Sequence, residues 1–186
     1  MSKRQKIAVY PGSFNPVHPG HIDIMRQAAQ VFDEVRVLVA CNPQKSYLVQ
    51  LDRRYSFIDG LLSPYYLEDW RGRIVIDSTG GSLVNYCQEH KIDTVIRGVR
   101  NGMDLEYEKT QGLYNRLLMP KNSQLNYVFF TVPADLEQFS STSIRQFIMY
   151  STPEQLSNLY FYGNCHGGSV QEVVKEIHEA YGGMNG

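Results

Sequence analysis

Short apolar segments alternate with longer amphipathic ones along this chain, and this alternation limits the possible fold more than any other feature. The short segments, which predict buried strands, are residues 7–10, 35–40, 74–76, 94–96 and 127–132. Between them apolar side chains recur every three or four residues, which predicts helices within 22–32, 51–62, 83–87 and 104–118. Strands and helices that alternate in this way form a parallel sheet with helices on both faces. We therefore expect an α/β fold with a doubly wound parallel sheet of five strands.

The same alternation continues without a break through most of the chain. No internal repeat, low-complexity segment or linker interrupts it, so we expect one domain over residues 1–186 with a core of about 6–150. A helical extension is expected over 153–186, where apolar residues from Val170 to Tyr181 form one stripe that ends at Gly182. This extra C-terminal helix either packs on the domain or contacts another copy of the chain, and the residues leave both alternatives open.

Charge and cysteine content exclude several classes of protein. A formal net charge of -1 argues against a protein that coats nucleic acid or an acidic membrane surface. No apolar run approaches the ~20 residues of a membrane span, and the run after the basic start is too short for a signal peptide, so we expect a cytoplasmic protein. Cys41, Cys87 and Cys165 form no CxxC pair, which argues against a disulfide framework or a thiolate zinc site. Cys41 and Cys87 lie in apolar segments and are expected in the core.

The segment from Tyr10 to His21 joins the first strand to the first helix and carries unusual residues. Gly12 can adopt positive φ and allows a ligand to approach the backbone, and Ser13 offers a hydroxyl. Gly20 and His21 stand where the helix begins, and the free N–H groups of a helix start attract anions. The segment fits neither the GxGxxG pattern nor the Walker loop. It therefore predicts an anion site of another kind, at the carboxyl edge of the sheet where ligands of such folds bind.

The run His18-Pro19-Gly20-His21 resembles the (T/H)xGH signature of the nucleotidyltransferase superfamily, which has a Rossmann-like fold. The resemblance implies that His21 is the catalytic residue, which binds an ATP phosphate and stabilises the transition state. For His18 a role at the site and a purely structural role are equally open. Because no carboxylate or third histidine is near in sequence, we expect no metal site made by this pair.

Two later motifs narrow the resemblance from the superfamily to one family within it. Arg97-Gly98-Val99-Arg100 follows the fourth strand, where two planar guanidinium groups can bind phosphates. The acidic run 104–108, DLEYE, opens the next helix, although acidic residues suit any helix start. Together these motifs, with the loop around Lys45, resemble the phosphopantetheine adenylyltransferases over roughly 7–148.

This resemblance implies a set of site residues, partners and a cofactor. The acceptor, 4′-phosphopantetheine, would be held by Ser13, Lys45, Leu83 and Arg97. Mg²⁺ would accompany the triphosphate, and the chain would form a homo-oligomer, with a hexamer as the expected assembly. ATP would be bound by a larger set: Ser13, Phe14, His21, Gly98, Val99, Arg100, Glu108, Glu137, Gln138, Phe139, Ser140, Ser141, Thr142 and Ser143.

The expected reaction is attack of the acceptor phosphate on the α-phosphorus of ATP, with release of pyrophosphate. A phosphate monoester has its second pKa at about 6, so it is already a dianion at neutral pH and no general base is required. The protein then has to position two anions and neutralise their charge, for which Lys45, Arg97, Arg100 and His21 are candidates.

Two alternatives remain open. Residues 12–18 and 141–145 are equally similar to nicotinamide- or nicotinate-mononucleotide adenylyltransferases of NAD synthesis, although the aromatic pocket that stacks the pyridine there is not apparent. A nucleotide-binding protein without catalysis is the alternative of another class. The intact motifs around His21, Arg97 and Ser141 argue against it.

Overall fold

The sheet has the predicted architecture. The structure is a computed structural model that describes residues 5–41, 49–65, 68–121, 123–160 and 168–182. Its five parallel strands lie in the order β3-β2-β1-β4-β5: β1 (Ile7–Gly12), β2 (Glu34–Ala40), β3 (Ile74–Thr79), β4 (Thr94–Val99) and β5 (Asn126–Thr131). The chain builds outward from β1 to β3 and then crosses back to β4. The strand order therefore reverses between β1 and β4, which is where ligands of such sheets bind.

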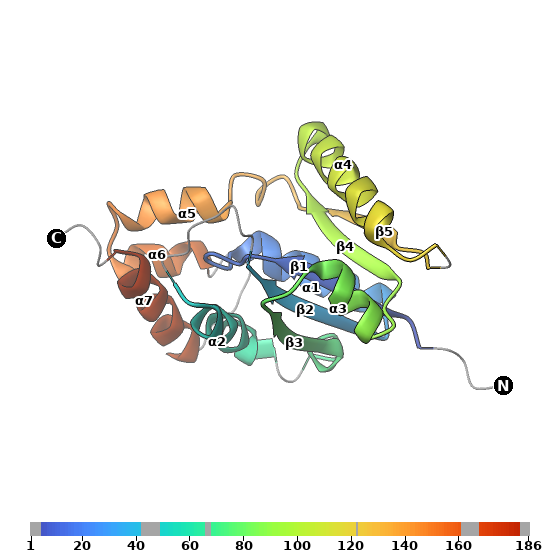
Figure 1. Cartoon of the computed structure of the whole chain (residues 1–186). Helices are drawn as coiled ribbons and strands as arrows, with labels where there is room; N and C mark the ends of the chain where they lie inside the picture. Colours follow the sequence, from blue (N-terminus) through green and yellow to red (C-terminus); the bar gives the residue numbers. More distant parts are fainter. Residues whose placement is uncertain (1–4, 42–48, 66–67, 122, 161–167, 183–186) are drawn as a thin grey trace.

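Helices cover both faces of this sheet (Figure 1). On one side lie α1 (Pro19–Val31) and α2 (Leu51–Leu62), and on the other lie α3 (Leu83–Glu89) and α4 (Gly102–Leu118). Neighbouring strand residues enter different cores: Ala8 and Val37 pack on the side of α1 and α2, whereas Val9 and Leu38 pack beside α3. Burial on both faces explains why the strands are continuously apolar. The Rossmann-like, doubly wound fold is thus confirmed.

Three more helices lie together at one end of the molecule (Figure 1). They are α5 (Ser141–Ile148), α6 (Pro153–Tyr160) and α7 (Gly168–Gly182). The extension thus packs on the core, with α7 against α2 at Gly60. A Cβ on Gly60 would lie only 2.5 Å from Val173 Cγ2, so a side chain there would push the helices apart. Two short 3₁₀ turns, Ser63–Tyr65 and Arg71–Arg73, complete the described elements.

The helical extension expected over 153–186 contains α7, which the apolar stripe indicates, and also α6, which no apolar stripe indicates as a separate helix. Helix α6 has only eight residues, too few for a clear apolar period. Its start nevertheless carries a capping box, because the Thr152 N–H donates to Gln155 Oε1 at 2.8 Å and the Gln155 N–H donates to Thr152 Oγ1 at 3.3 Å. The sequence Thr-Pro-Glu-Gln was therefore the available signal.

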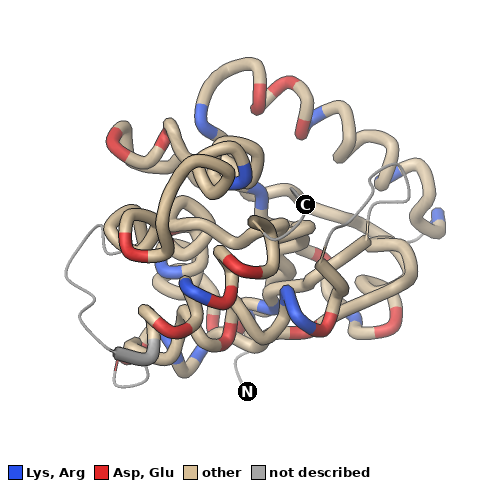
Figure 2. Tube along the Cα trace, turned by 90° about the vertical axis from the view of Figure 1, so that its left-hand side faces the viewer, with Lys and Arg blue, Asp and Glu red and all other residues tan. Residues whose placement is uncertain are grey.

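Charges of both signs are distributed over the described part of the trace (Figure 2), in agreement with the net charge of -1. None of the described helices combines the length and the apolar character that crossing a membrane requires.

Candidate active site

The loop between β1 and α1 places His21 at the carboxyl edge of the sheet. A Cβ on Gly12 would lie 2.8 Å from the Phe14 ring, so glycine at this position lets that ring fold back under the loop. Phe14 itself has a φ of 44° and is 1% exposed. Its ring meets the His21 imidazole edge-on, with centroids 4.9 Å apart. The loop therefore supports the imidazole from one side.

A backbone hydrogen bond determines which nitrogen of His21 carries the proton. The His18 N–H donates to His21 Nδ1 at 3.2 Å, so Nδ1 acts as an acceptor and the proton of the neutral ring is on Nε2. Burial and, to a lesser extent, the charge of Arg100 lower the pKa of His21 to about 3. His21 is thus a neutral Nε2–H donor at pH 7.

His18 caps α1 and lies against His21. The two imidazoles stack with centroids 3.7 Å apart. Burial, followed by the neighbouring His21 and Arg100, holds the pKa of His18 well below its usual range. Its Nδ1 is buried and has no hydrogen-bond partner among the described residues.

A cavity of about 350 Å³ opens in front of these rings, between the starts of α1 and α5 and the end of β4. Seven predicted ATP residues line it: His21, Gly98, Arg100, Glu108, Phe139, Ser140 and Ser141. His18, whose role was open, and Gly20 of the predicted anion site also line it, together with residues that the sequence-based prediction missed: Tyr10, Ile24, Asp104, Tyr107 and Val132. Both helix starts bring free N–H groups to the cavity, which suits a polyphosphate.

The remaining predicted ATP residues lie elsewhere. Phe14 and Val99 are buried, and Ser13 lines a second cavity. Glu137, Gln138 and Thr142 are exposed outside the cavity lining. Ser143 is used within its own helix: its N–H donates to Ser140 Oγ at 3.0 Å, and its hydroxyl accepts from the Ser140 N–H at 2.8 Å. Ser143 thus forms a capping box with Ser140, in which Ser140 is the N-cap residue and Ser143 occupies the third helical position.

Ser143→Ala is expected to lower the free energy of unfolding by about 1 kcal/mol, because half of this capping box is lost. The Kd for ATP, measured by calorimetry, should stay unchanged, and Ser143→Thr should restore the stability. Weaker ATP binding in Ser143→Ala without a loss of stability would contradict this and would place the hydroxyl on the nucleotide.

A second cavity, of about 550 Å³, lies beside the first at the same edge of the sheet. The predicted acceptor residues Ser13, Leu83 and Arg97 line it, whereas Lys45 lies outside the described residues. Its wall also contains Glu108, which was predicted to bind ATP, and residues outside both predicted sets: Pro11, Gly12, Ala40, Cys41, Gly80, Gly81, Ser82, Tyr107, Gln111 and Asn115. The glycine pair after β3 was an available signal, since it also ends a strand at the ligand edge.

The expectation of a buried Cys41 is wrong, although Cys87 is buried as predicted. Cys41 directly follows the last residue of β2 at the ligand edge of the sheet, so its side chain lies on the cavity wall rather than between sheet and helix. Its Sγ accepts from the buried guanidinium group of Arg54 at 3.4 Å.

The two cavities meet at Tyr107 and Glu108, which line both. Arg97 Nε and Glu108 Oε2 are 3.0 Å apart, yet neither of these buried atoms has a hydrogen bond among the described residues. Arg97 also donates to Pro11 O at 3.0 Å. One turn earlier on α4, Asp104 binds Arg100 at 2.9 Å. Each cavity therefore has one arginine beside a carboxylate, Arg100 in the first and Arg97 in the second, and phosphate oxygens can replace these carboxylates.

The strand β4 is longer than predicted, because Arg97, Gly98 and Val99 pair with β5 in register instead of forming a loop. This pairing fixes the backbone beneath the two arginines. Among the described residues, no group of three His, Cys, Asp or Glu side chains is arranged to hold a metal ion.

The neutral histidines predict a dependence of stability on pH. An unfolded chain protonates His18 and His21 near pH 6.5, whereas the folded protein does not. The unfolded state thus binds more protons below pH 6.5, so the free energy of unfolding falls as the pH decreases from about 6.5 toward 3. His21 contributes about 1.4 kcal/mol per pH unit over this range, and His18 adds to the slope in the same direction.

Urea unfolding at pH 7, 6 and 5 measures this slope. His21→Gln should have a shallower slope than the wild type by up to about 1.4 kcal/mol per pH unit. Equal slopes would mean that His21 is not held neutral in the folded state.

Comparison with known proteins agrees with this geometry. A family model described as cytidylyltransferase-like matches residues 9–147. The chain is 37% identical to the phosphopantetheine adenylyltransferase of Thermotoga neapolitana over 161 residues, which covers 83% of this chain and 94% of the relative. It is 36% identical to the phosphopantetheine adenylyltransferase of Desulforudis audaxviator over 181 residues, covering 97% and 98%.

Solved structures share the fold at low sequence identity. Nicotinic acid mononucleotide adenylyltransferase of Plasmodium falciparum, complexed with NaAD, has a TM-score of 0.65 at 14% identity, covering 96% of this chain and 98% of the other. A bifunctional NMN adenylyltransferase/ADP ribose pyrophosphatase from Francisella tularensis has a TM-score of 0.60 at 13% identity, covering 95% and 51%. These similarities support the fold assignment.

Proposed function

The chain belongs to the phosphopantetheine adenylyltransferase family of nucleotidyltransferases, and from this we propose that it transfers the adenylyl group of ATP to 4′-phosphopantetheine. The products are dephospho-coenzyme A and pyrophosphate, in the synthesis of coenzyme A. The observation that carries this proposal is the pair of cavities that meet at Tyr107 and Glu108, with Arg97 paired to Glu108 and the neutral donor His21 at the edge of one cavity. An enzyme that joins two phosphate compounds requires two such cavities and a shared centre.

In this assignment ATP occupies the cavity beside His21, and the acceptor occupies the cavity beside Leu83. The acceptor phosphate lies at Arg97, in line with the α-phosphorus. The polyphosphate lies over the starts of α1 and α5, where backbone N–H groups, His21 and Arg100 can neutralise its charge.

The reaction exchanges one bond to the α-phosphorus for another. An oxygen of the acceptor dianion forms the new P–O bond, and the bond from the α-phosphorus to the bridging oxygen breaks, so that pyrophosphate leaves with that electron pair. Negative charge develops on the oxygens around the α-phosphorus and on the leaving group. Nε2–H of His21 donates to that charge without a change of its own protonation state, and Arg97 and Arg100 offset the repulsion between the two anions.

We propose Mg²⁺ as the cofactor. Because the described residues form no cage for a metal ion, the triphosphate itself would supply most of its ligands, together with water. When bound, the ion supplies charge neutralisation on the phosphate oxygens.

A panel of acceptors tests the substrate. Pyrophosphate release with ATP is expected with 4′-phosphopantetheine and not with nicotinamide or nicotinate mononucleotide. Turnover of a mononucleotide alone would overturn the assignment in favour of the NAD-synthesis alternative. Release with no acceptor of the panel would favour a nucleotide-binding protein without catalysis.

We also propose that the protein is a homo-oligomer, with a hexamer as the expected assembly. Among the described residues of α4 only Gly112 is buried, and Met103, Tyr114, Leu117 and Leu118 are exposed. A second copy of the chain could cover this apolar surface. Analytical ultracentrifugation tests the proposal, and a monomeric wild-type protein would contradict it. With mixed charges and ATP as substrate, we place the protein in the cytoplasm, without nucleic acid or membrane as partner.

A further inference from the structure

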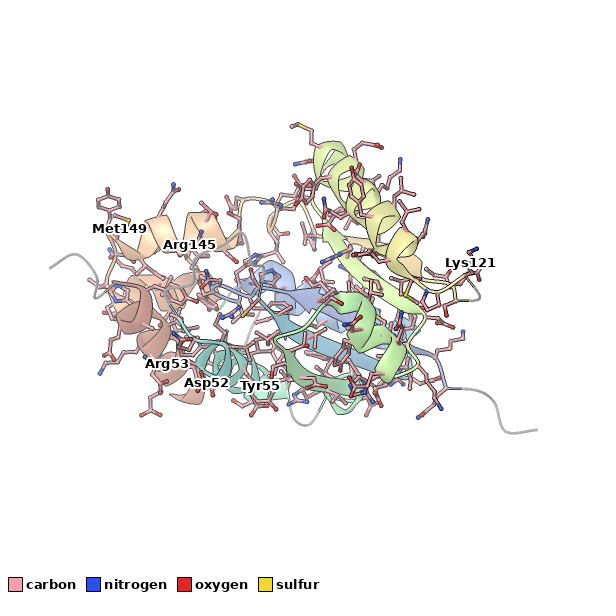
Figure 3. All side chains as sticks on the ribbon, viewed as in Figure 1. Asp52, Arg53, Tyr55, Lys121, Arg145 and Met149 are labelled. Carbon is pink, nitrogen blue, oxygen red and sulfur yellow. The ribbon has the colours of Figure 1, made fainter. Side chains whose placement is uncertain are left out.

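The loop before His21 accepts hydrogen bonds from side chains that are far away in the sequence. Arg145, labelled on α5 in Figure 3, donates to the carbonyl of Asn15. Three other carbonyls of the loop accept from side chains of α2, α5 and α6: Ser13 O from Arg54, Pro16 O from Ser141 and Val17 O from Tyr160. From α7, the Tyr181 hydroxyl donates to Asn15 Oδ1 at 2.6 Å. The C-terminal extension thus takes part in organising this loop.

One of these contacts acts on a peptide group that also touches His21. The Tyr160 hydroxyl donates to Val17 O at 2.6 Å. The N–H of the same peptide unit belongs to His18 and donates to His21 Nδ1 at 3.2 Å. In a trans peptide the C=O and N–H point in opposite directions, so this single planar unit connects Tyr160 on one side with His21 on the other.

We propose that Tyr160 is a positioning residue for catalysis. Its hydroxyl fixes the orientation of the peptide between Val17 and His18, and this peptide in turn holds His21 with the proton on Nε2, toward the ATP cavity. A hydrogen bond to the carbonyl also polarises the amide and strengthens its N–H as a donor. The inference rests on the proposed function in one respect only, namely that His21 acts on the phosphates of ATP.

The surroundings of Tyr160 suit this role. Its side chain is only 7% exposed, so water has little access to the Val17 carbonyl. Burial, together with the nearby Tyr181, raises the pKa of the Tyr160 phenol, which therefore remains a donor. If the hydroxyl were absent, this peptide could rotate, because its carbonyl would lose its partner. His21 Nδ1 would then lose its donor, and the two neutral tautomers of the ring would mix.

Tyr160→Phe tests the proposal, with Tyr181→Phe as the matched control. Both variants remove one buried hydroxyl that binds the loop, but only Tyr160 binds the peptide next to His21. We expect kcat to fall about 10-fold in Tyr160→Phe with little change in the KM for ATP, on the scale of a lost orienting partner. Tyr181→Phe should lower the melting temperature and leave kcat within about 2-fold. Equal changes in kcat for both variants would overturn the proposal.

The tautomer of His21 provides a readout that does not depend on turnover. In ¹⁵N-resolved NMR of the imidazoles, wild-type His21 should have an unprotonated Nδ1 and a protonated Nε2. Tyr160→Phe should shift these signals toward a mixture, and Tyr181→Phe should not. An Nδ1–H tautomer in the wild type overturns the proposal even if Tyr160→Phe fails to fold. If the tautomer changes as expected while no acceptor is turned over, the proposed function fails, and what stands is that Tyr160 orients His21.

Discussion

Replacing His21 by alanine is expected to reduce kcat by about 10²- to 10³-fold while the KM for ATP changes little. The imidazole presents a neutral Nε2–H donor at the edge of the cavity, and loss of one donor that is already oriented toward developing charge has this effect. The effect falls on kcat if the hydrogen bond is stronger in the transition state than in the bound substrate. Because the pKa of His21 is lowered to about 3, kcat of the wild type should show no inflection between pH 6 and 8 from this group.

The same variant also removes a helix cap, so stability has to be measured in parallel. His21 Nδ1 accepts the His18 N–H at the start of α1, and alanine leaves that donor unpaired. We therefore expect a lower melting temperature together with the loss of turnover. His21→Gln is the control, because glutamine at the third helical position can accept this N–H and restore the cap. A His21→Gln protein with normal stability and low kcat supports the catalytic role. Near-normal kcat in His21→Ala would rule out the catalytic role of His21.

Replacing Arg97 by alanine is expected to raise the KM for 4′-phosphopantetheine by about 10- to 100-fold, with a much smaller effect on ATP. A hydrogen bond to a charged group contributes about 1.5–3 kcal/mol, which corresponds to this range. Arg97 lines the acceptor cavity, whereas Arg100 lines the ATP cavity. Arg100→Ala should accordingly show the opposite pattern, with the larger change for ATP.

Glu108 is the ion-pair partner of Arg97, so Arg97→Ala leaves this carboxylate without its cation at the junction of the cavities. This change also affects the KM values of the variant. Repulsion between this carboxylate and the phosphates would then weaken the binding of both substrates. The double variant Arg97→Ala/Glu108→Gln removes that charge, so its acceptor KM should remain high while its ATP KM returns to the wild-type value. Equal increases for the two substrates in the double variant would place Arg97 outside the acceptor site.

The sequence predicts the sheet well, because each strand and helix leaves a local apolar period. The five strands and the helix at 51–62 are examples, and the motif at His21 stands at the predicted junction. The sequence does not predict where a side chain lies when its position depends on residues that only the fold brings close. Cys41 lies in an apolar run, but the end of β2 turns its side chain toward a cavity. No local pattern indicates this outcome.

The hydrogen bonds from the C-terminal helices to the catalytic loop cannot be predicted from the sequence, for another reason. Tyr160 and Tyr181 occupy apolar positions of ordinary amphipathic helices, and nothing nearby marks their hydroxyls as donors to residues more than 140 positions earlier. The prediction accordingly assigned the extension only to packing or to an oligomer contact. A tyrosine facing a core must place its hydroxyl on some acceptor, but the acceptor is defined only when the fold brings the two together.

The anchoring of the loop has a consequence for the order of events during protein synthesis. The first strand and its loop leave the ribosome early, yet their donors Ser141, Arg145, Tyr160 and Tyr181 are among the last quarter of the chain to be made. At about 5–20 residues per second, the nascent loop waits on the order of ten seconds for these partners. A nascent chain can therefore complete its sheet before its nucleotide loop is organised, and a chain released before Tyr181 is made lacks the hydroxyl that binds Asn15. The rate of turnover, which depends on the Tyr160 contact, would thus distinguish finished molecules from chains that end before Tyr160.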